Sequence, residues 1–220
     1  MKIHGSLCHI AFVYPHGHTH LPSLSNFIAS FKDDSFTCHY PPLSLTSDLK
    51  WWSDTLAIPN VTRPLILCGP PMNLGLYVDA STSWGIGIIY GDRWDAWKTI
   101  EGWVGCFRDI GWLEGVTLEL LIYMMEEQGI RNSHIILHSD NQGLIGAFDK
   151  GQSCNFEVNL SIQYSTTVLT TSNISIAVIY IDLKLNPADL ISCSITGPVT
   201  NQLLFLFLLP QELQPFLIHV

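Results

Sequence analysis

The amino-acid sequence predicts an α/β domain over residues 74–195, in which a mixed five-stranded sheet is flanked by helices. Two patterns predict this fold. Residues 74–98 form three strand-like runs, the last two separated by a tight Gly-Asp turn, as in an antiparallel meander. Later β-rich runs alternate with helix-like segments, which is typical of parallel strands. The 220 residues are 47% hydrophobic and 13% charged, so the chain can bury a core and is not disordered.

The predicted elements follow one another along this domain. The first strand alternates between apolar and polar residues over Leu74–Asp79, and Gly91-Asp92 forms the turn between the second and third. A long apolar helix over 110–128 is closed by Gly129, and Pro187 suits the start of the last helix. The other predicted elements are strands over 84–90, 93–98, 135–138 and 175–181, and helices over 141–148 and 156–171.

The segments on either side of the domain differ from it in their sequence patterns. Residues 1–73 are predicted to form a helical appendage that ends in a stretch rich in Pro and Gly, from Pro59 to Pro71, the best candidate boundary. Residues 196–220 are predicted to be an irregular tail. Within the appendage the predicted elements are helices over 24–31 and 43–56 and a His-rich loop from Pro15 to Pro22.

Composition excludes several classes of protein. Ten Lys and Arg against nineteen Asp and Glu give a formal net charge of −9, which disfavours a purely electrostatic nucleic-acid binder. Six scattered cysteines without a Cys-x-x-Cys pair indicate a reduced, intracellular protein, in the cytoplasm or nucleus. The apolar run Leu203–Leu209 is too short to span a bilayer, so no membrane partner is expected.

Carboxylates follow two strands of the predicted sheet. Asp79 ends the first strand, and Asp140 follows the fourth. Ligands of α/β sheets gather at the carboxyl ends of strands, and Mg²⁺ prefers carboxylate oxygens, so the two could share a divalent cation. The alternative for each Asp is that it caps a turn or the following helix.

Two further acids are candidates. Glu114 and Glu119 point about 140° apart on the long helix, so they cannot serve one site. Glu119 shares a face with Glu126, which is predicted to be solvated, whereas Glu114 shares a face with apolar residues and would be costly there unless paired or metal-bound. Asp189 lies in the first turn of the last helix. For both Glu114 and Asp189 the alternative is a favourable interaction with the helix dipole.

Taken together, the local sequences around these acids resemble the ribonuclease H superfamily. They are Leu76-Tyr77-Val78-Asp79-Ala80-Ser81 with Trp84-Gly85-Ile86-Gly87, Trp112-Leu113-Glu114, His138-Ser139-Asp140-Asn141, and Asn186-Pro187-Ala188-Asp189. They are most similar to the RNase H domain of reverse-transcriptase polyproteins from retrotransposons, particularly the tyrosine-recombinase (DIRS-type) elements of fungi. Upstream, residues 5–11, 20–24 and 48–52 resemble the thumb and connection of those polyproteins. The resemblance covers about residues 5–195, without the fingers and palm, so the chain looks like a fragment or a domesticated descendant.

This resemblance implies a fold, an activity and a site. The fold would be RNase H-like, with an N-terminal thumb remnant. Asp79, Glu114, Asp140 and Asp189 would be the catalytic acids and would hold two Mg²⁺ or Mn²⁺ ions. The reaction would be endonucleolytic hydrolysis of the RNA strand of an RNA–DNA hybrid, which leaves 3′-hydroxyl and 5′-phosphate ends. Ser81, Asn141 and Asn186 would contact the hybrid, although a turn or cap role fits Ser81 and Asn141 equally well.

Other interpretations remain open from the sequence. The segment 74–192 has six Lys and Arg against fourteen Asp and Glu, so the hybrid would bind weakly unless a polymerase domain on another chain helped. The same poverty in basic residues favours a catalytically inactive element fragment that acts as a nucleic-acid or protein interaction module. A third possibility is an exonuclease or transposase of the same superfamily. His16, His18 and His20 could bind zinc with Cys38 or His39, but a loop of accidental composition is the simpler interpretation.

Overall fold

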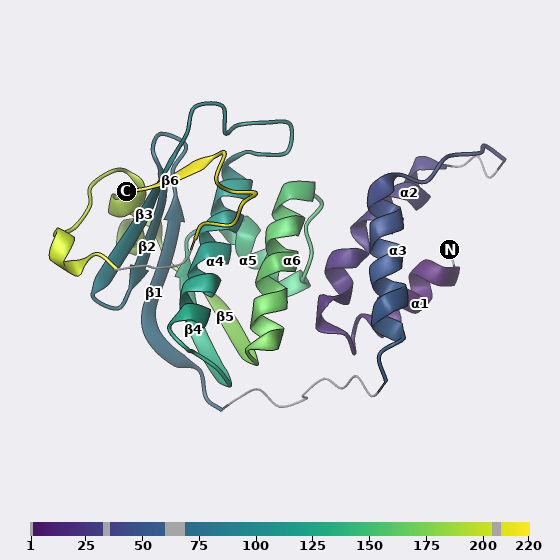
Figure 1. Cartoon of the computed structure of the whole chain (residues 1–220), viewed down its shortest axis with the longest axis horizontal. Coiled ribbons are helices and arrows are strands. Elements are labelled where there is room, and N and C mark those ends of the chain that lie inside the picture. The colour runs from purple at the N-terminus through teal and green to yellow at the C-terminus, as the bar shows by residue number, and fades with distance from the viewer. Residues whose placement is uncertain (1, 33–35, 60–68, 204–207) are drawn as a thin grey trace.

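A computed structural model describes residues 2–32, 36–59, 69–203 and 208–220. Its centre is one mixed six-stranded sheet of order β5-β4-β1-β2-β3-β6 (Figure 1). Strands β1, β2 and β3 form an antiparallel meander, β4 and β5 extend it in parallel, and β6 pairs antiparallel with β3. The strands are β1 (Met72–Ala80), β2 (Gly85–Tyr90), β3 (Arg93–Thr99), β4 (Ser133–Ser139), β5 (Ile174–Tyr180) and β6 (Leu217–His219). The prediction of a mixed α/β sheet is therefore confirmed, but the predicted number of strands was one too few.

The local sequence explains where the elements turn and end. Gly91 and Asp92 join Tyr90 to its partner Arg93, and Gly91 has φ +65°, as a two-residue hairpin turn requires. Helix α4 (Ile110–Glu127) is capped by the preceding Asp109, whose carboxylate accepts a hydrogen bond from the Trp112 backbone amide at 3.1 Å. Three more α-helices follow in the described residues, namely α5 (Gln142–Lys150), α6 (Phe156–Thr171) and the short α7 (Ala188–Ser192).

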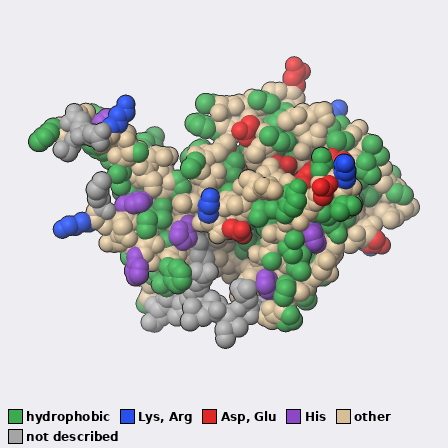
Figure 2. All heavy atoms as spheres, turned by 180° about the vertical axis from the view of Figure 1, so that it is seen from behind, with side chains coloured by type: hydrophobic (Ala, Val, Ile, Leu, Met, Phe, Trp, Pro, Cys, Tyr) green, Lys and Arg blue, Asp and Glu red, His purple; other side chains and the backbone are tan. Residues whose placement is uncertain are grey.

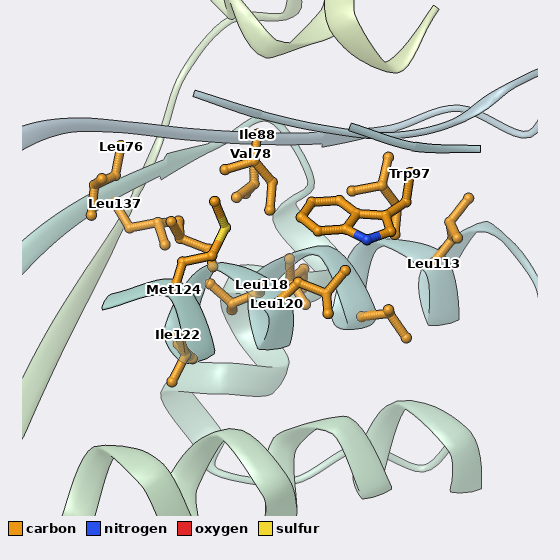
Figure 3. Packing of buried hydrophobic residues seen from close by; sticks show 14 of the residues in the cluster. Leu76, Val78, Ile88, Trp97, Leu113, Leu118, Leu120, Ile122, Met124 and Leu137 are labelled. Atoms are coloured by element: carbon orange, nitrogen blue, oxygen red, sulfur yellow. The ribbon is translucent and has the colours of Figure 1, made fainter. Parts of the chain in front are cut away.

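Helices cover both faces of the sheet. Helix α4 packs against β1 and β2 on one face, while α7 packs against β1, β2 and β3 on the other. The main core lies between the sheet and α4, where Val78 and Ile88 meet Leu118 and Met124 (Figure 3). On the opposite face Ile191 of α7 packs with Trp94 and Ala96. The shared core thus fixes the position of α4 against the sheet, and with it the positions of the side chains that α4 carries.

The tail does more than the sequence predicted. Residues 196–220 include a 3₁₀ helix, η3 (Val199–Asn201), and strand β6, and Leu203, Leu213 and Leu217 are buried in the main core. The prediction of a solvated face on α4 was also wrong, because Glu119 is only 1% exposed and lies close to Ser161 of α6. Its carboxylate accepts a hydrogen bond from the Tyr123 hydroxyl at 3.0 Å.

The N-terminal residues form helices, as predicted. They are α1 (Lys2–Ile10), the 3₁₀ helix η1 (Pro15–His20), α2 (Pro22–Ser30) and α3 (Leu43–Leu56). A short 3₁₀ helix, η2 (Leu183–Leu185), lies in the later domain. Leu7, Ala11, Leu21 and Trp52 make a separate small core. The segment predicted as a His-rich loop is therefore mostly η1, whereas most of the predicted boundary, residues 60–68, lies outside the described residues.

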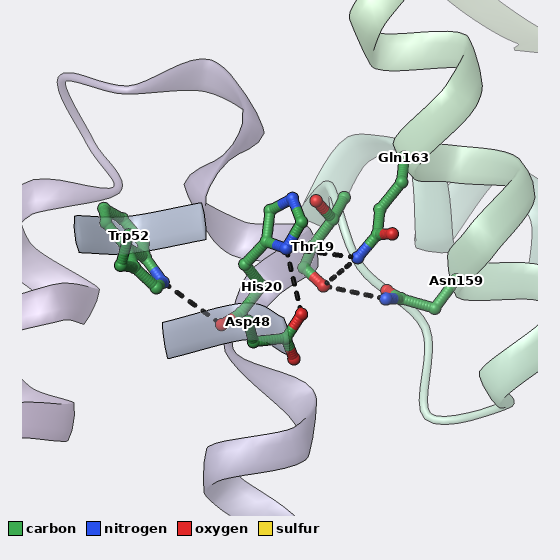
Figure 4. A network of polar contacts seen from close by, with 6 residues as sticks. All are labelled: Thr19, His20, Asp48, Trp52, Asn159 and Gln163. Carbon is green, nitrogen blue, oxygen red and sulfur yellow. Dashed lines mark hydrogen bonds and ion pairs between the residues drawn. The ribbon is translucent and has the colours of Figure 1, made fainter. Parts of the chain in front are cut away.

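Polar contacts join the N-terminal helices to α6. The backbone carbonyl of Thr19 accepts hydrogen bonds from the side-chain amides of Asn159, at 2.8 Å, and Gln163, at 2.9 Å (Figure 4). Beside it His20 Nδ1 lies 2.9 Å from Asp48 Oδ1. A buried carbonyl satisfied twice by one neighbouring helix fixes the appendage on α6.

None of the helices in the described ranges is long and apolar enough to cross a membrane.

Candidate metal centre

Three of the predicted acids meet at one edge of the sheet. Asp79 comes from β1, Asp140 follows β4, and Glu114 projects from α4. One carboxylate oxygen from each lies within 4.8 Å of the other two. Since β1 and β4 are parallel neighbours, with Tyr77 beside His138 in the register, the residues after them emerge at the same edge. The structure thus confirms that these three side chains form a carboxylate cluster.

Glu114 is the most confined member of the cluster. It is 5% exposed, and its Oε2 atom has no hydrogen-bond partner among the described residues. Burial raises the pKa of Glu114 to about 8, and the charges of Asp79 and Asp140 act in the same direction. The polar atoms around Glu114 therefore do not offset the free-energy cost of burying a negative charge there.

Asp79 is the member of the cluster that also contacts helix α7. It is 4% exposed, and burial is the main cause that raises its pKa to about 7. The hydrogen bond from the Ser192 hydroxyl opposes this rise, while the charges of Asp140 and Asp189 add to it. Close to neutral pH the free cluster therefore retains protons, as expected for carboxylates that crowd one another.

Asp189 is the predicted acid that the cluster does not include. It lies on α7, partly buried, and is near enough to influence Asp79 electrostatically. The structure therefore brings three of the four acids together and leaves the fourth beside them. A metal-binding role for Asp189 stays a prediction.

The three predicted substrate contacts have structural roles. The side-chain oxygen of Asn141 caps α5 by accepting from the Leu144 amide at 2.9 Å, which is the cap interpretation. Ser81 Oγ lies 2.8 Å from Ser83 Oγ in the turn after β1. Asn186 is 4% exposed, and its amide donates to the Val78 carbonyl at 3.0 Å. Contact between these residues and a nucleic acid stays a prediction.

Sequence reasoning missed three neighbours of the cluster, namely Gln142, Tyr180 and Ser192. A cleft of about 440 Å³ opens onto it and is lined by Glu114, Asp140, Asn141, Gln142 and Tyr180. Tyr180 is the last residue of β5, paired with Ser139, so its place at the strand end was the signal available. Ser192 lies three residues after Asp189 on the same short helix, a spacing that places both on one side of it.

A larger cleft lies elsewhere and lacks this chemistry. It has a volume of about 510 Å³ and lies between α2, α3 and α6. Asp48 is its single acidic residue, and His20 is already engaged with that carboxylate. We therefore place the candidate site at the carboxylate cluster, which is also the one set of potential metal ligands found in the described part of the chain.

The cluster fits a hard divalent cation. Mg²⁺ and Mn²⁺ prefer carboxylate oxygens, and three of them converge here. The unpartnered Oε2 of Glu114 is a buried polar atom that a cation would satisfy. These observations define the class: an α/β protein with a buried Asp-Glu-Asp site that could hold a metal ion. Neither the family models nor the curated proteins compared with this chain gave a match.

Proposed function

We propose that this protein is a metal-dependent nuclease of the RNase H type, which hydrolyses the RNA strand of RNA–DNA hybrids as the RNase H part of a retroelement reverse transcriptase. The convergence of Asp79, Glu114 and Asp140 at one sheet edge is the observation that supports it. The order of strands, a meander extended by two parallel strands, is compatible with that superfamily.

The chain's own residues would bind and position the cations. Asp79 would be shared between two ions, with Glu114 and Asp140 as further ligands of one and Asp189 as a ligand of the other. When bound, the two ions supply activation of the attacking water and stabilisation of the leaving oxygen. The open side of the cleft, at Gln142 and Tyr180, is where the substrate backbone would approach.

The scarcity of basic side chains indicates that the domain does not bind the RNA–DNA hybrid alone. On the face shown in Figure 2 the described Lys and Arg side chains lie scattered and form no patch. A phosphate backbone is held mainly by such groups. The proposal therefore includes a partner, a polymerase domain supplied by another chain, which would provide most of the affinity for the hybrid.

The test is hydrolysis of a labelled hybrid by the purified chain with Mg²⁺ or Mn²⁺. Wild-type protein should release products with 5′-phosphate ends, and Asp79→Asn should abolish the reaction. Asp149→Asn removes an exposed acid of α5 and is the matched control, which should retain full activity. Cleavage that survives in Asp79→Asn would reject the assignment of the site.

The low content of basic residues supports a second candidate, an inactive element fragment that acts as an interaction module. Six Lys and Arg against fourteen acids in residues 74–192 is the observation that favours it. The two candidates differ in their response to metal. A functional site gains stability from millimolar Mg²⁺ or Mn²⁺ because the ion binds the folded state, whereas an inactive fragment that has lost metal binding shows no such gain.

A further inference from the structure

A buried hydroxyl connects the carboxylate cluster to the helix that carries Asp189. Ser192 is the last residue of α7 and is completely buried. Its Oγ donates a hydrogen bond to Asp79 Oδ2. The same Oγ lies 3.0 Å from the backbone carbonyl of Asp189, one turn earlier. One hydroxyl proton therefore faces two oxygen acceptors, and the carboxylate, once ionised, is the stronger of them.

The backbone is built for this contact. In the pairing of β1 with β2, Gly87 lies directly beside Asp79. A Cβ atom on Gly87 would lie 2.5 Å from the Ser192 backbone nitrogen and 2.6 Å from the Ala188 carbonyl oxygen, so any other residue would push α7 away. Helix α7 thus rests directly on the backbone of β2, beside the paired Asp79, which brings Ser192 within reach of the Asp79 carboxylate.

A purely local explanation does not account for these contacts. Serine near the end of a helix commonly bonds back to a carbonyl one turn earlier, as Ser192 could with Asp189. That bond requires neither the close approach at Gly87 nor the burial of the hydroxyl against a carboxylate. The contact with Asp79 joins residues 113 positions apart in the sequence, one on a strand and one on the helix that packs against it.

We propose that Ser192 is a positioning residue for the metal site, and this rests on the proposed function. Its hydroxyl donates a hydrogen bond to Oδ2 of Asp79 and so restrains rotation of the carboxylate. As a result Oδ1 keeps a fixed orientation. The hydroxyl also ties Asp79 to the helix that carries Asp189, and so sets the separation of the two acids that would hold the second ion. Outer-shell hydrogen bonds of this kind typically change metal affinity by about 10–100-fold.

The test is the affinity for Mn²⁺ measured by titration calorimetry on the full chain, which does not depend on activity. Ser192→Ala should weaken Mn²⁺ binding by about tenfold or more. Ser165→Ala is the matched control, because Ser165 is equally buried, on α6, and its hydroxyl has no hydrogen-bond partner among the described residues. Ser192→Cys keeps the volume with a weak donor and should give an intermediate affinity, which covers the case in which the alanine variant does not fold.

The outcomes separate this inference from the proposed function. Wild-type affinity in both Ser192 variants, with hybrid cleavage intact in the wild type, would overturn the role of Ser192 alone. A wild-type chain that neither binds Mn²⁺ nor cleaves the hybrid would overturn the proposed function, and the role of Ser192 with it. Weakened binding in Ser165→Ala to the same extent would show a general packing effect and would also overturn the role.

Discussion

His219 Nε2 lies 2.7 Å from Asp95 Oδ1 and joins the last strand of the sheet to its neighbour. Asp95 on β3 is fully buried, and its second oxygen has no hydrogen-bond partner in the described part of the chain. Gln202 also approaches Oδ1, at 3.4 Å, and the His219 ring packs at a tilt on Trp97. Because β6 has only three residues, this side-chain contact adds to a short ladder with β3 and to the burial of Leu217.

Attachment of β6 should therefore depend on pH. The hydrogen bond that His219 donates to Asp95 is the main cause that raises the pKa of His219. A raised histidine pKa means that the contribution is complete below the unfolded value of about 6.5 and is lost as pH rises through the folded value. Hydrogen exchange of the β3 and β6 amides should accelerate over that range. His219→Asn should remove the pH dependence, whereas His9→Asn, at an exposed position, should leave it unchanged.

Glu114 should make the metal-free protein less stable as pH rises. The unfolded chain ionises this residue near a pKa of about 4.3, whereas the folded protein keeps the proton until about pH 8. Stability is therefore lost between these values, because the folded state binds more protons there. Glu114→Gln should recover on the order of a few kcal/mol at alkaline pH. Urea unfolding in the presence of a chelator measures this, and an unchanged pH slope would contradict it.

Glu119 provides a matched comparison, since it is a buried acid on the same helix with a different neighbourhood. Burial raises its pKa to about 8 as well, opposed by hydrogen bonds from Ser161 and Tyr123. Glu119→Gln should flatten the pH dependence of stability as Glu114→Gln does. It should leave the stabilisation by Mn²⁺ intact, whereas Glu114→Gln should reduce it. Thermal melting with and without Mn²⁺ distinguishes the two, and an equal loss of the metal effect would argue against the site.

The junction at Thr19 should be sensitive to the loss of one amide. Asn159→Ala removes a donor to the Thr19 carbonyl and an acceptor for the Ser153 amide. Loss of buried hydrogen bonds of this kind costs about 1–3 kcal/mol. Urea unfolding should report that loss, and amides in η1 should exchange faster. Thr167→Ala changes an exposed residue of the same helix and should have little effect.

Local patterns predicted much of this structure, and tertiary contacts determined the rest. Helix α3, predicted from its apolar spacing, and helix α6, predicted as a polar helix, both match their predicted bounds. Asp79 and Asp140 could be placed at one edge because strand ends converge in a parallel pair. Strand β6 could not be predicted, since three residues carry too little periodicity to indicate a strand.

The misassigned face of α4 has a related cause. Glu119 and Glu126 are seven residues apart, which indicates a shared face but not what covers it. Ser161 of α6 and Glu212 of the tail lie close to Glu119, and both are far away from it in the sequence. Likewise, the position of Asp189 beside the cluster depends on how α7 docks at Gly87, and no local pattern encodes that docking.

The position of β6 has a consequence for how the chain is made. A ribosome releases β3 and α4 long before residues 213–219, so a nascent chain displays the free edge of β3 and part of the apolar surface of α4. An exposed strand edge next to apolar surface is a template for pairing with other chains. Translation that stops short of Leu213 should therefore yield a product that aggregates, because the β3 edge and this part of α4 are covered only once residues 213–219 have been made.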